Sequence, residues 1–254
     1  GMGYPGWHIE CSTMSRKYLG PLIDIHTGGV DHIPVHHENE IAQSESLEGK
    51  KTVNTWMHGE FMLVDGGKMS KSLGNTYTLA QLEEKGYEPL SYRYFCLNTH
   101  YRKKLNFTFE GLEAAQTAYR RLLAALYEHK ISAAATPEDK LARFKNNFVE
   151  AINDDINVPM ALGILWTMIK EPSSIDIYNL ALEFDKVLGL SLEKARPEEK
   201  PEIEVPDDIR RIAEERLKAR AEKNWAESDR LRDILSEKGY AVLDSKNGYK
   251  LERK

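Results

Sequence analysis

Cysteine is scarce in this sequence, long apolar runs are absent, and basic residues are not in surplus. The two cysteines, Cys11 and Cys96, are too few for a disulfide scaffold, so a reducing cytoplasm is the expected location. No apolar run approaches the roughly 18 residues that a membrane helix needs. The formal net charge of -5 argues against loose, purely electrostatic binding to nucleic acid, but leaves room for local basic patches that meet a structured RNA.

The composition is typical of a globular protein with long amphipathic helices. Hydrophobic residues make up 41% of the 254 residues and charged residues 30%. The opening residues 3–7 (GYPGW) resemble a turn in the middle of a domain. We therefore expect the N-terminal part of a larger protein to precede this chain.

The beginning of the chain predicts part of an α/β sheet. Residues 22–26 form a short apolar run that ends at a pair of glycines, as a buried strand would. A helix is expected at 36–47, and a second strand at 60–64 is closed by a turn of aspartate and two glycines. This strand–helix–strand order is typical of α/β proteins.

The middle of the chain is predicted to be helical. Thr78 is a suitable helix cap, and apolar residues recur at helical spacing over 109–129. Pro137 marks the first turn of another helix. Three helices are expected here, near residues 137–153, 158–171 and 174–188. Together these helices would form a bundle.

A compact tail is expected after a linker. Proline and charged residues dominate 192–208, which is the composition of a linker, and we place the linker at 193–206. Helices are predicted at 207–222 and 225–238. Residues 240–251 have the pattern of a β-hairpin.

Cys11, His36 and Glu40 are candidate ligands for a metal ion. On a helix, His36 and Glu40 share one face, and an imidazole with a carboxylate at that spacing can bind Zn²⁺. A thiolate from Cys11 would leave one position open for water or substrate. Each residue also has an ordinary explanation, since a lone cysteine is usually a small core residue and a His–Glu pair often a solvated helix face. Five of the eight histidines lie in the first 37 residues, and this density favours the metal-binding interpretation.

Residues 68–75 (KMSKSLGN) have the pattern of a phosphate-binding loop. Lys68 and Lys71 flank small hydroxyl residues, and nearby glycines allow the backbone to bend. Two ammonium groups in such a loop can stabilise charge on an α-phosphate during nucleotidyl transfer. The ordinary alternative is a surface loop of lysine and serine. The Leu-Gly-Asn that follows, and the position of the loop between a strand and a helix, favour the interpretation as a nucleotide-binding loop.

These motifs together resemble those of cysteinyl-tRNA synthetases, which are class I aminoacyl-tRNA synthetases. The resemblance covers essentially the whole chain. The segments that carry it are 6–12 (GWHIECS), 24–26 (DIH), 36–44 (HHENEIAQS), 56–58 (WMH), 68–75 (KMSKSLGN) and 224–233 (NWAESDRLRD). It implies a ligase that activates L-cysteine with ATP and transfers it to cysteine tRNA.

The resemblance implies that Cys11, His36 and Glu40 bind a zinc ion that holds the thiolate of the substrate cysteine. Zinc prefers a soft thiolate to the hydroxyl of serine, which is harder and much less acidic, so serine would be rejected without an editing site. Amino acids that differ by one methylene, in contrast, are separated by only about 1–3 kcal/mol.

The resemblance also assigns the other contacts. Trp7, His26 and Asp31 match positions that line the amino-acid pocket, and Asp31 is suited to the α-ammonium group or the adenosine. The structural alternatives are a packed core aromatic for Trp7 and a strand-end hydrogen bonder for His26. Lys68 and Lys71 are implied as catalytic residues. ATP, with Mg²⁺, is expected to bind Lys68, Met69, Ser70, Lys71 and Ser72.

By resemblance, the fold class is a partial α/β Rossmann-type catalytic domain, followed by mostly helical domains and a small α+β domain. The catalytic part would be residues 1–75. The remaining parts would be a connecting helical fold that contacts the tRNA stem (76–132), a helical bundle (133–192), the linker (193–206) and an anticodon-binding domain (207–254). A monomer without contact to a membrane is expected.

The sequence departs from the family pattern in two ways. The family's N-terminal half carries a further zinc-binding cysteine and a His-x-Gly-His motif for the ATP phosphates, and neither occurs here. We therefore expect the chain alone to bind zinc weakly and to form little or no cysteinyl-adenylate. Residues 31–35 (DHIPV) also replace the apolar residues and proline that usually precede the paired histidines, which we interpret as variation between lineages.

Two alternatives remain open. A ligase that joins cysteine to an amino-sugar in thiol biosynthesis shares this catalytic core, but it has no need of an anticodon-binding tail. A remnant that binds tRNA through its helical domains and has lost catalysis is the second alternative.

Overall fold

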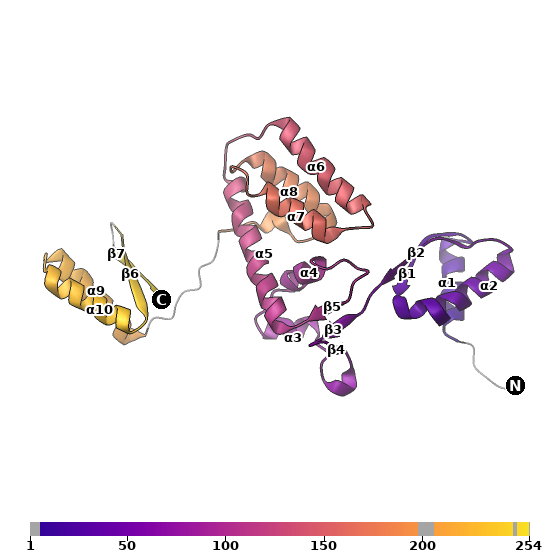
Figure 1. Ribbon diagram of the computed structural model, residues 1–254, viewed down its shortest axis with the longest axis horizontal. Helices are drawn as coiled ribbons and strands as arrows, with labels where there is room; N and C mark the ends of the chain where they lie inside the picture. The colour runs from indigo at the N-terminus through magenta and orange to yellow at the C-terminus, as the bar shows by residue number, and fades with distance from the viewer. Residues whose placement is uncertain (1–5, 198–205, 246–247, 254) are drawn as a thin grey trace. The chain divides into compact units, whose positions relative to one another are not determined.

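The computed structural model describes residues 6–197, 206–245 and 248–253. The chain divides into two compact units, 1–198 and 199–254. Helices dominate both units, and the described strands form three small sheets (Figure 1). In the part of the chain that the structure describes, no helix is both long and apolar enough to cross a membrane.

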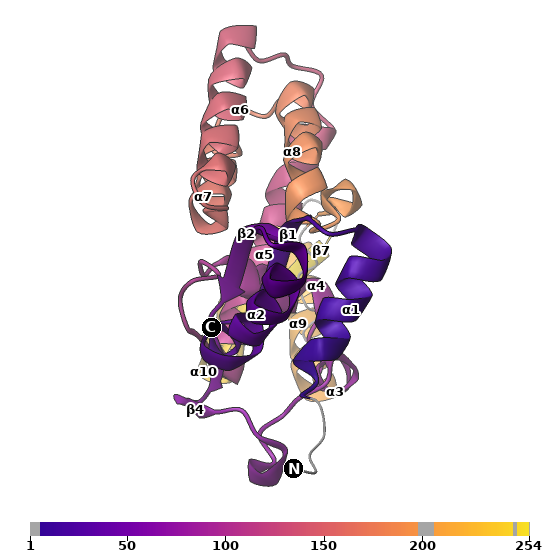
Figure 2. The ribbon, with the colours of Figure 1, turned by 90° about the vertical axis from the view of Figure 1, so that its right-hand side faces the viewer.

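The first unit opens with two helices and two parallel strands. These elements are α1 (His8–Leu19), β1 (Ile23–Gly29), α2 (Glu38–Glu48) and β2 (Val53–Gly59). Ile23 lies opposite Val53 and Gly29 opposite Gly59, so the two strands end together. α1 packs against α2 (Figure 2). The chain that follows β1 therefore starts at the carboxyl edge of the sheet, where α/β proteins commonly bind ligands.

The strand predicted at 22–26 and the helix predicted at 36–47 are confirmed as β1 and α2. The sequence does not predict α1 or β2. No residue of α1 is buried, so this helix lacks the apolar stripe that reveals a helix in a sequence. In β2 only Val53 is buried, and the strand has no regular alternation of apolar and polar residues.

A second small sheet holds the start of the lysine loop. Its central strand β3 (Met62–Val64) is shorter than the strand predicted at 60–64. It pairs antiparallel with β4 (Gly67–Lys68) and parallel with β5 (Leu105–Phe107). The turn between β3 and β4 has positive φ angles of 49° at Asp65 and 75° at Gly66, which is typical of tight hairpins.

Six more helices follow in the first unit. They are α3 (Leu79–Glu84), α4 (Pro89–Leu97), α5 (Phe109–Lys130), α6 (Glu138–Asn153), α7 (Val158–Met168) and α8 (Ile175–Leu188), and the last three agree with the helices of the predicted bundle. Thr78 caps α3 in a capping box with Gln81, as expected. Pro137 was predicted in the first turn of a helix. In the structure it is the N-cap of α6 and lies just outside that turn.

The core of this unit lies along α5. Its stripe of apolar residues, predicted from their spacing, is fully buried, and Phe148 of α6 stacks on Phe184 of α8 with ring centroids 3.9 Å apart. Leu192 and Ala195 are also buried in this core, and the hydroxyl of Tyr119 donates a hydrogen bond of 2.8 Å to the Leu190 carbonyl. The core of this unit therefore includes the first residues of the predicted linker. Residues 198–205 of that linker lie outside the described residues.

The second unit pairs two helices with a hairpin, as predicted. Its elements are α9 (Asp207–Ala221), α10 (Trp225–Glu237), β6 (Tyr240–Ser245) and β7 (Gly248–Arg253). Ile209, Ala213, Leu235 and Tyr240 form its small core. The turn of the hairpin, at 246–247, lies outside the described residues.

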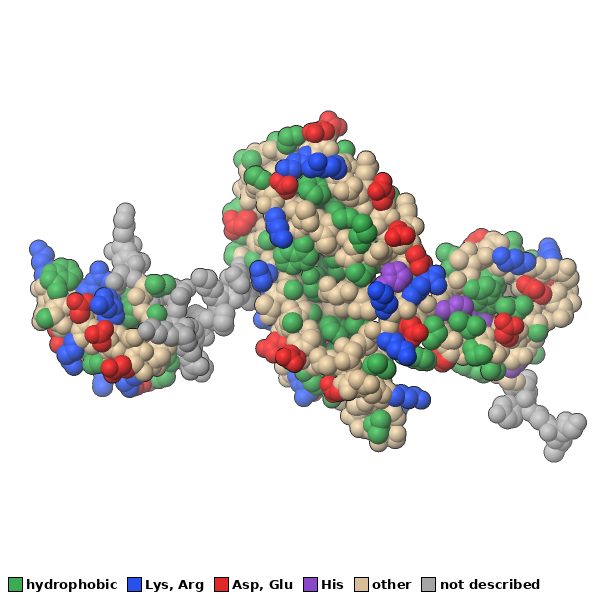
Figure 3. All heavy atoms as spheres, viewed as in Figure 1, with side chains coloured by type: hydrophobic (Ala, Val, Ile, Leu, Met, Phe, Trp, Pro, Cys, Tyr) green, Lys and Arg blue, Asp and Glu red, His purple; other side chains and the backbone are tan. Residues whose placement is uncertain are grey.

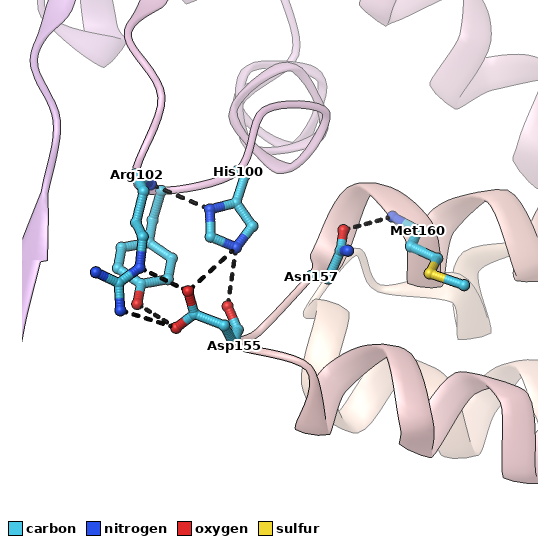
Figure 4. Close-up of polar contacts among 6 residues, drawn as sticks. His100, Arg102, Asp155, Asn157 and Met160 are labelled. Carbon is cyan, nitrogen blue, oxygen red and sulfur yellow. Dashed lines mark hydrogen bonds and ion pairs between the residues drawn. The ribbon is translucent and has the colours of Figure 1, made fainter.

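One carboxylate holds the turn between α6 and α7 to the loop that precedes β5 (Figure 4). Asp155 accepts hydrogen bonds from Arg102 Nε at 2.6 Å and from the Tyr101 hydroxyl at 2.5 Å. These two donors, Arg102 first, lower the pKa of Asp155 from 3.8 to about 2. Asp155 and Ile156 have positive φ angles of 53° and 55°, a conformation that is strained for a β-branched residue. The contact therefore helps to hold a strained turn in place.

Replacing Asp155 with Asn should lower the urea midpoint of unfolding at pH 6, because an amide cannot form the charge-assisted pair with Arg102. The folded-state pKa is depressed, so the ionised carboxylate stabilises the fold fully above about pH 4, and this stabilisation is lost as the pH falls through about 2. The difference in midpoint between the wild type and D155N should shrink over that window. The neighbouring D154N is the matched control, and an equal, pH-independent effect of both variants would contradict the assignment.

Candidate functional site

The chain between β1 and α2 forms a widened helical turn. A 3-10 turn (Val30–His32) runs into a π-helical turn (Ile33–His37), which continues directly as α2. π-Helical turns are rare and often lie at functional sites. His36 and His37 are consecutive, yet both are buried, with exposed fractions of 7% and 3%. The turn thus directs two neighbouring imidazoles into the protein.

The three predicted ligands come together from separate elements. Cys11 lies on α1, His36 on the π-helical turn and Glu40 on α2, and one ligand atom of each lies within 4.8 Å of the others. His36 Nε2 is 3.8 Å from Glu40 Oε2, as expected for residues that share a helix face. We call these three residues the metal-ligand group.

Glu40 is the most unusual member of this group. Its exposed fraction is 4%, and neither carboxylate oxygen has a hydrogen-bond partner. His26 Nε2 lies 3.0 Å from Oε2, which is close enough for an ion pair but lacks the geometry of a hydrogen bond. Burial raises the pKa of Glu40 to about 7. Because a buried carboxylate without a partner is costly, a cation fits here.

The other donors also fit a metal ion. Burial, followed by the neighbouring imidazoles, lowers the pKa values of His26, His36 and His37, that of His37 to about 4. These side chains are therefore neutral near pH 7, which is the form that binds metal. Burial, followed by the charge of Glu40, raises the pKa of the Cys11 thiol. A thiol, an imidazole and a carboxyl group are a donor set that suits Zn²⁺.

Two of the three predicted pocket residues lie against the metal-ligand group. Trp7 is 62% exposed and its ring lies 4.5 Å from that of His36, so it is not the packed core aromatic of the structural alternative. His26, on β1, reaches Glu40 and packs on the ring of Trp56 at 4.6 Å. Asp31 is exposed on the 3-10 turn. Histidine side chains are visible at the surface of this part of the chain (Figure 3).

The lysine loop is closed by its own asparagine. Asn75 accepts a hydrogen bond of 2.8 Å from the Ser70 backbone N–H and donates one of 3.0 Å to the Lys68 carbonyl. Lys68 ends β4, and Lys71 begins a 3-10 turn, with both side chains exposed. Among the described residues, no hydrogen bond or ion pair joins this loop to the metal-ligand group.

Sequence reasoning assigned no role to three further histidines of the cluster. His32 and His37 have ligand nitrogens within 4.8 Å of one another and of His36, and His37 Nδ1 lies 2.8 Å from His58 Nε2. The density of histidines was a signal of this cluster. However, consecutive residues of a regular α-helix point about 100° apart. His36 and His37 nevertheless come together, with ring centroids 5.6 Å apart, at the end of the π-helical turn, which the sequence does not reveal.

Residues 1–117 match the family described as "tRNA synthetases class I (C) catalytic domain". Cysteine--tRNA ligase 1 of Burkholderia lata is 47% identical over 253 residues, which cover 99% of this chain and 52% of that protein. Cysteine--tRNA ligase of Opitutus terrae is 44% identical and is covered to 53%, again with 99% of this chain. The chain thus spans about half the length of the curated relatives it matches.

The fold has a counterpart among solved structures. The LeuRS of Agrobacterium radiobacter K84, in a ternary complex with tRNA and LeuAMS, superposes with a TM-score of 0.52. The match covers 68% of this chain and 26% of that one at 16% identity, so it concerns the fold alone. Residues 1–117 thus match the catalytic domain of class I tRNA synthetases, and nearly the whole chain is similar to one half of cysteine--tRNA ligases.

Proposed function

We propose that this chain supplies the metal-binding, nucleotide-loop and tRNA-binding parts of a cysteine–tRNA ligase, which activates L-cysteine with ATP and transfers it to cysteine tRNA. The convergence of Cys11, His36 and Glu40 at the carboxyl edge of β1 carries the proposal. The cysteine--tRNA ligases that align with the whole chain support it, and they favour it over a cysteine–amino-sugar ligase.

Zn²⁺ is the ion that we propose for the metal-ligand group. When bound, it would supply an open coordination position that takes a thiolate in preference to a hydroxyl. The chain's own residues shape the surroundings of that position. Trp7 covers His36 from the exposed side, and His26 lies against Glu40 on the strand side. Asp31 carries a negative charge suited to the α-ammonium group of an amino acid.

Lys68 and Lys71 are proposed to act on ATP, which would bind with Mg²⁺. During activation, the carboxylate of cysteine attacks the α-phosphorus and pyrophosphate leaves, so negative charge grows on the phosphate oxygens. Two exposed ammonium groups on a closed loop can stabilise that charge. The proposed nucleotide contacts are Lys68, Met69, Ser70, Lys71 and Ser72.

The helical parts are proposed to bind tRNA. Residues 76–132 would contact the stem, 133–192 would form the bundle beside it, and 207–254 would reach the anticodon beyond the linker 193–206. The resemblance to cysteinyl-tRNA synthetases supports this division, with 1–75 as the catalytic part. We propose that the protein acts as a monomer in the cytoplasm.

Replacing Cys11 with Ser should weaken zinc binding by about tenfold or more, because a hydroxyl is a poor substitute for a thiolate ligand. The wild-type chain is expected to bind one Zn²⁺ weakly, since the family's further zinc-binding cysteine is absent from this sequence. Competition with a chromophoric chelator measures both affinities. The matched control is Cys96→Ser, which changes the cysteine of α4, outside the group. Equal losses in both variants, or none in C11S, would refute the proposed site.

Cysteine-dependent pyrophosphate exchange by the purified 254-residue chain should lie close to background. The sequence contains no His-x-Gly-His motif to hold the ATP phosphates. Isotope exchange between ATP and labelled pyrophosphate, with and without cysteine, tests this directly. Robust exchange would overturn the expectation and show that the chain holds a sufficient ATP site by itself.

In the natural protein that contains this chain, Lys71→Ala should lower kcat for charging of cysteine tRNA by about 10²–10³-fold, the usual effect of losing one group that stabilises transition-state charge. Lys50→Ala removes an exposed lysine away from the loop and should leave kcat unchanged. Transfer of cysteine to an amino-sugar, with no charging of tRNA, would replace the proposed function with that of the alternative ligase.

A further inference from the structure

Three imidazoles form a second group of possible ligands beside the first. One nitrogen each of His32, His36 and His37 lies within 4.8 Å of the others. The ring centroids are 5.0 Å apart for His32 and His36, 5.3 Å for His32 and His37, and 5.6 Å for His36 and His37. A tetrahedral metal ion with M–N bonds of about 2.0–2.1 Å needs nitrogens about 3.3 Å apart, so small side-chain rotations would suffice.

The backbone is built in a way that gathers these rings. His32 ends the 3-10 turn, and His36 and His37 end the π-helical turn that follows. Because a π-helical turn is wider than an α-helical one, residues four and five positions after His32 both return to its side. In a regular α-helix, His37 would point away from that side. The rare turn thus accounts for the gathering of the three imidazoles.

Two of the three rings pack closely on the backbone of β1 at Gly28. A Cβ atom added to Gly28 would lie 2.8 Å from His37 Nε2 and 2.9 Å from His32 Nδ1. The φ angle of Gly28 is not positive, so the glycine is needed there for space rather than for its backbone conformation. One nitrogen of each ring therefore lies next to Gly28, so the missing side chain lets both rings approach the same place. His36 Nδ1, in addition, is buried without a hydrogen-bond partner.

We propose that His32, His36 and His37 form a second, nitrogen-only position for a divalent transition-metal ion, next to the metal-ligand group. Because His36 is common to both sets, the two positions are alternatives for one ion. Imidazole donors suit Ni²⁺ and Cu²⁺, whereas the thiolate-containing set suits Zn²⁺. Ions of different preference would therefore be sorted between the two positions.

Nickel binding by the untagged 254-residue chain tests this position separately from the zinc site. C11S, which lacks the thiolate, should still bind one Ni²⁺ in isothermal titration. Adding His32→Gln to C11S should weaken that binding by about tenfold or more. His8→Gln is the control, because His8 lies 6.2 Å from His36 in ring-centroid distance and belongs to neither set. Loss of nickel binding in C11S alone, or equal affinities of the H32Q and H8Q variants, would overturn the proposal.

Gly28→Ala provides a second test in the wild-type background. The added methyl group would clash with the rings of His32 and His37 and displace them, so nickel binding should fall while zinc binding to the metal-ligand group persists. Far-UV circular dichroism confirms that the variant is folded. Zinc added first should also weaken nickel binding by about tenfold or more. Independent binding of both ions with unchanged affinities would show that His36 is not shared.

Discussion

The burial of Glu40 among neutral imidazoles constrains the whole N-terminal part of this molecule. The carboxyl group reaches its position because β1 and β2 end together and the intervening chain turns back into α2. It has no hydrogen-bond partner there, and its raised pKa reflects that isolation. A cation would let the carboxylate ionise and would occupy the lone pairs of the imidazoles. Metal binding at this site would therefore release protons, which would couple metal affinity to pH.

The parts of the fold that bury a regular apolar face could be predicted from the sequence. α5 and α8 have such faces, and the capping residue Thr78 marks the start of α3. α1 could not be predicted, because it buries none of its residues, and β2 has no alternating pattern. These two elements carry Cys11 and Trp56, so the weakest secondary-structure signals in the chain lie next to its chemistry.

Only the part of the candidate site that depends on local spacing could be predicted from the sequence. The i,i+4 spacing of His36 and Glu40 holds across the junction of the π-helical turn and α2, so this pair follows from the sequence. The presence of Cys11 beside them depends on the packing of α1 against α2, which spacing does not encode. His37 and His58 were missed because their contact depends on the width of one turn and on the register of β2.

The ring formed by Asn75 affects how the lysine loop can respond to an anion. From the end of the loop, the Asn75 side chain reaches its beginning, at the Lys68 carbonyl and the Ser70 N–H. The backbone between the two lysines is therefore already ordered, and little conformational entropy remains to be lost when an anion binds. Should an anion bind here, as proposed, its affinity would depend mainly on the two ammonium charges and their solvation rather than on ordering of the loop.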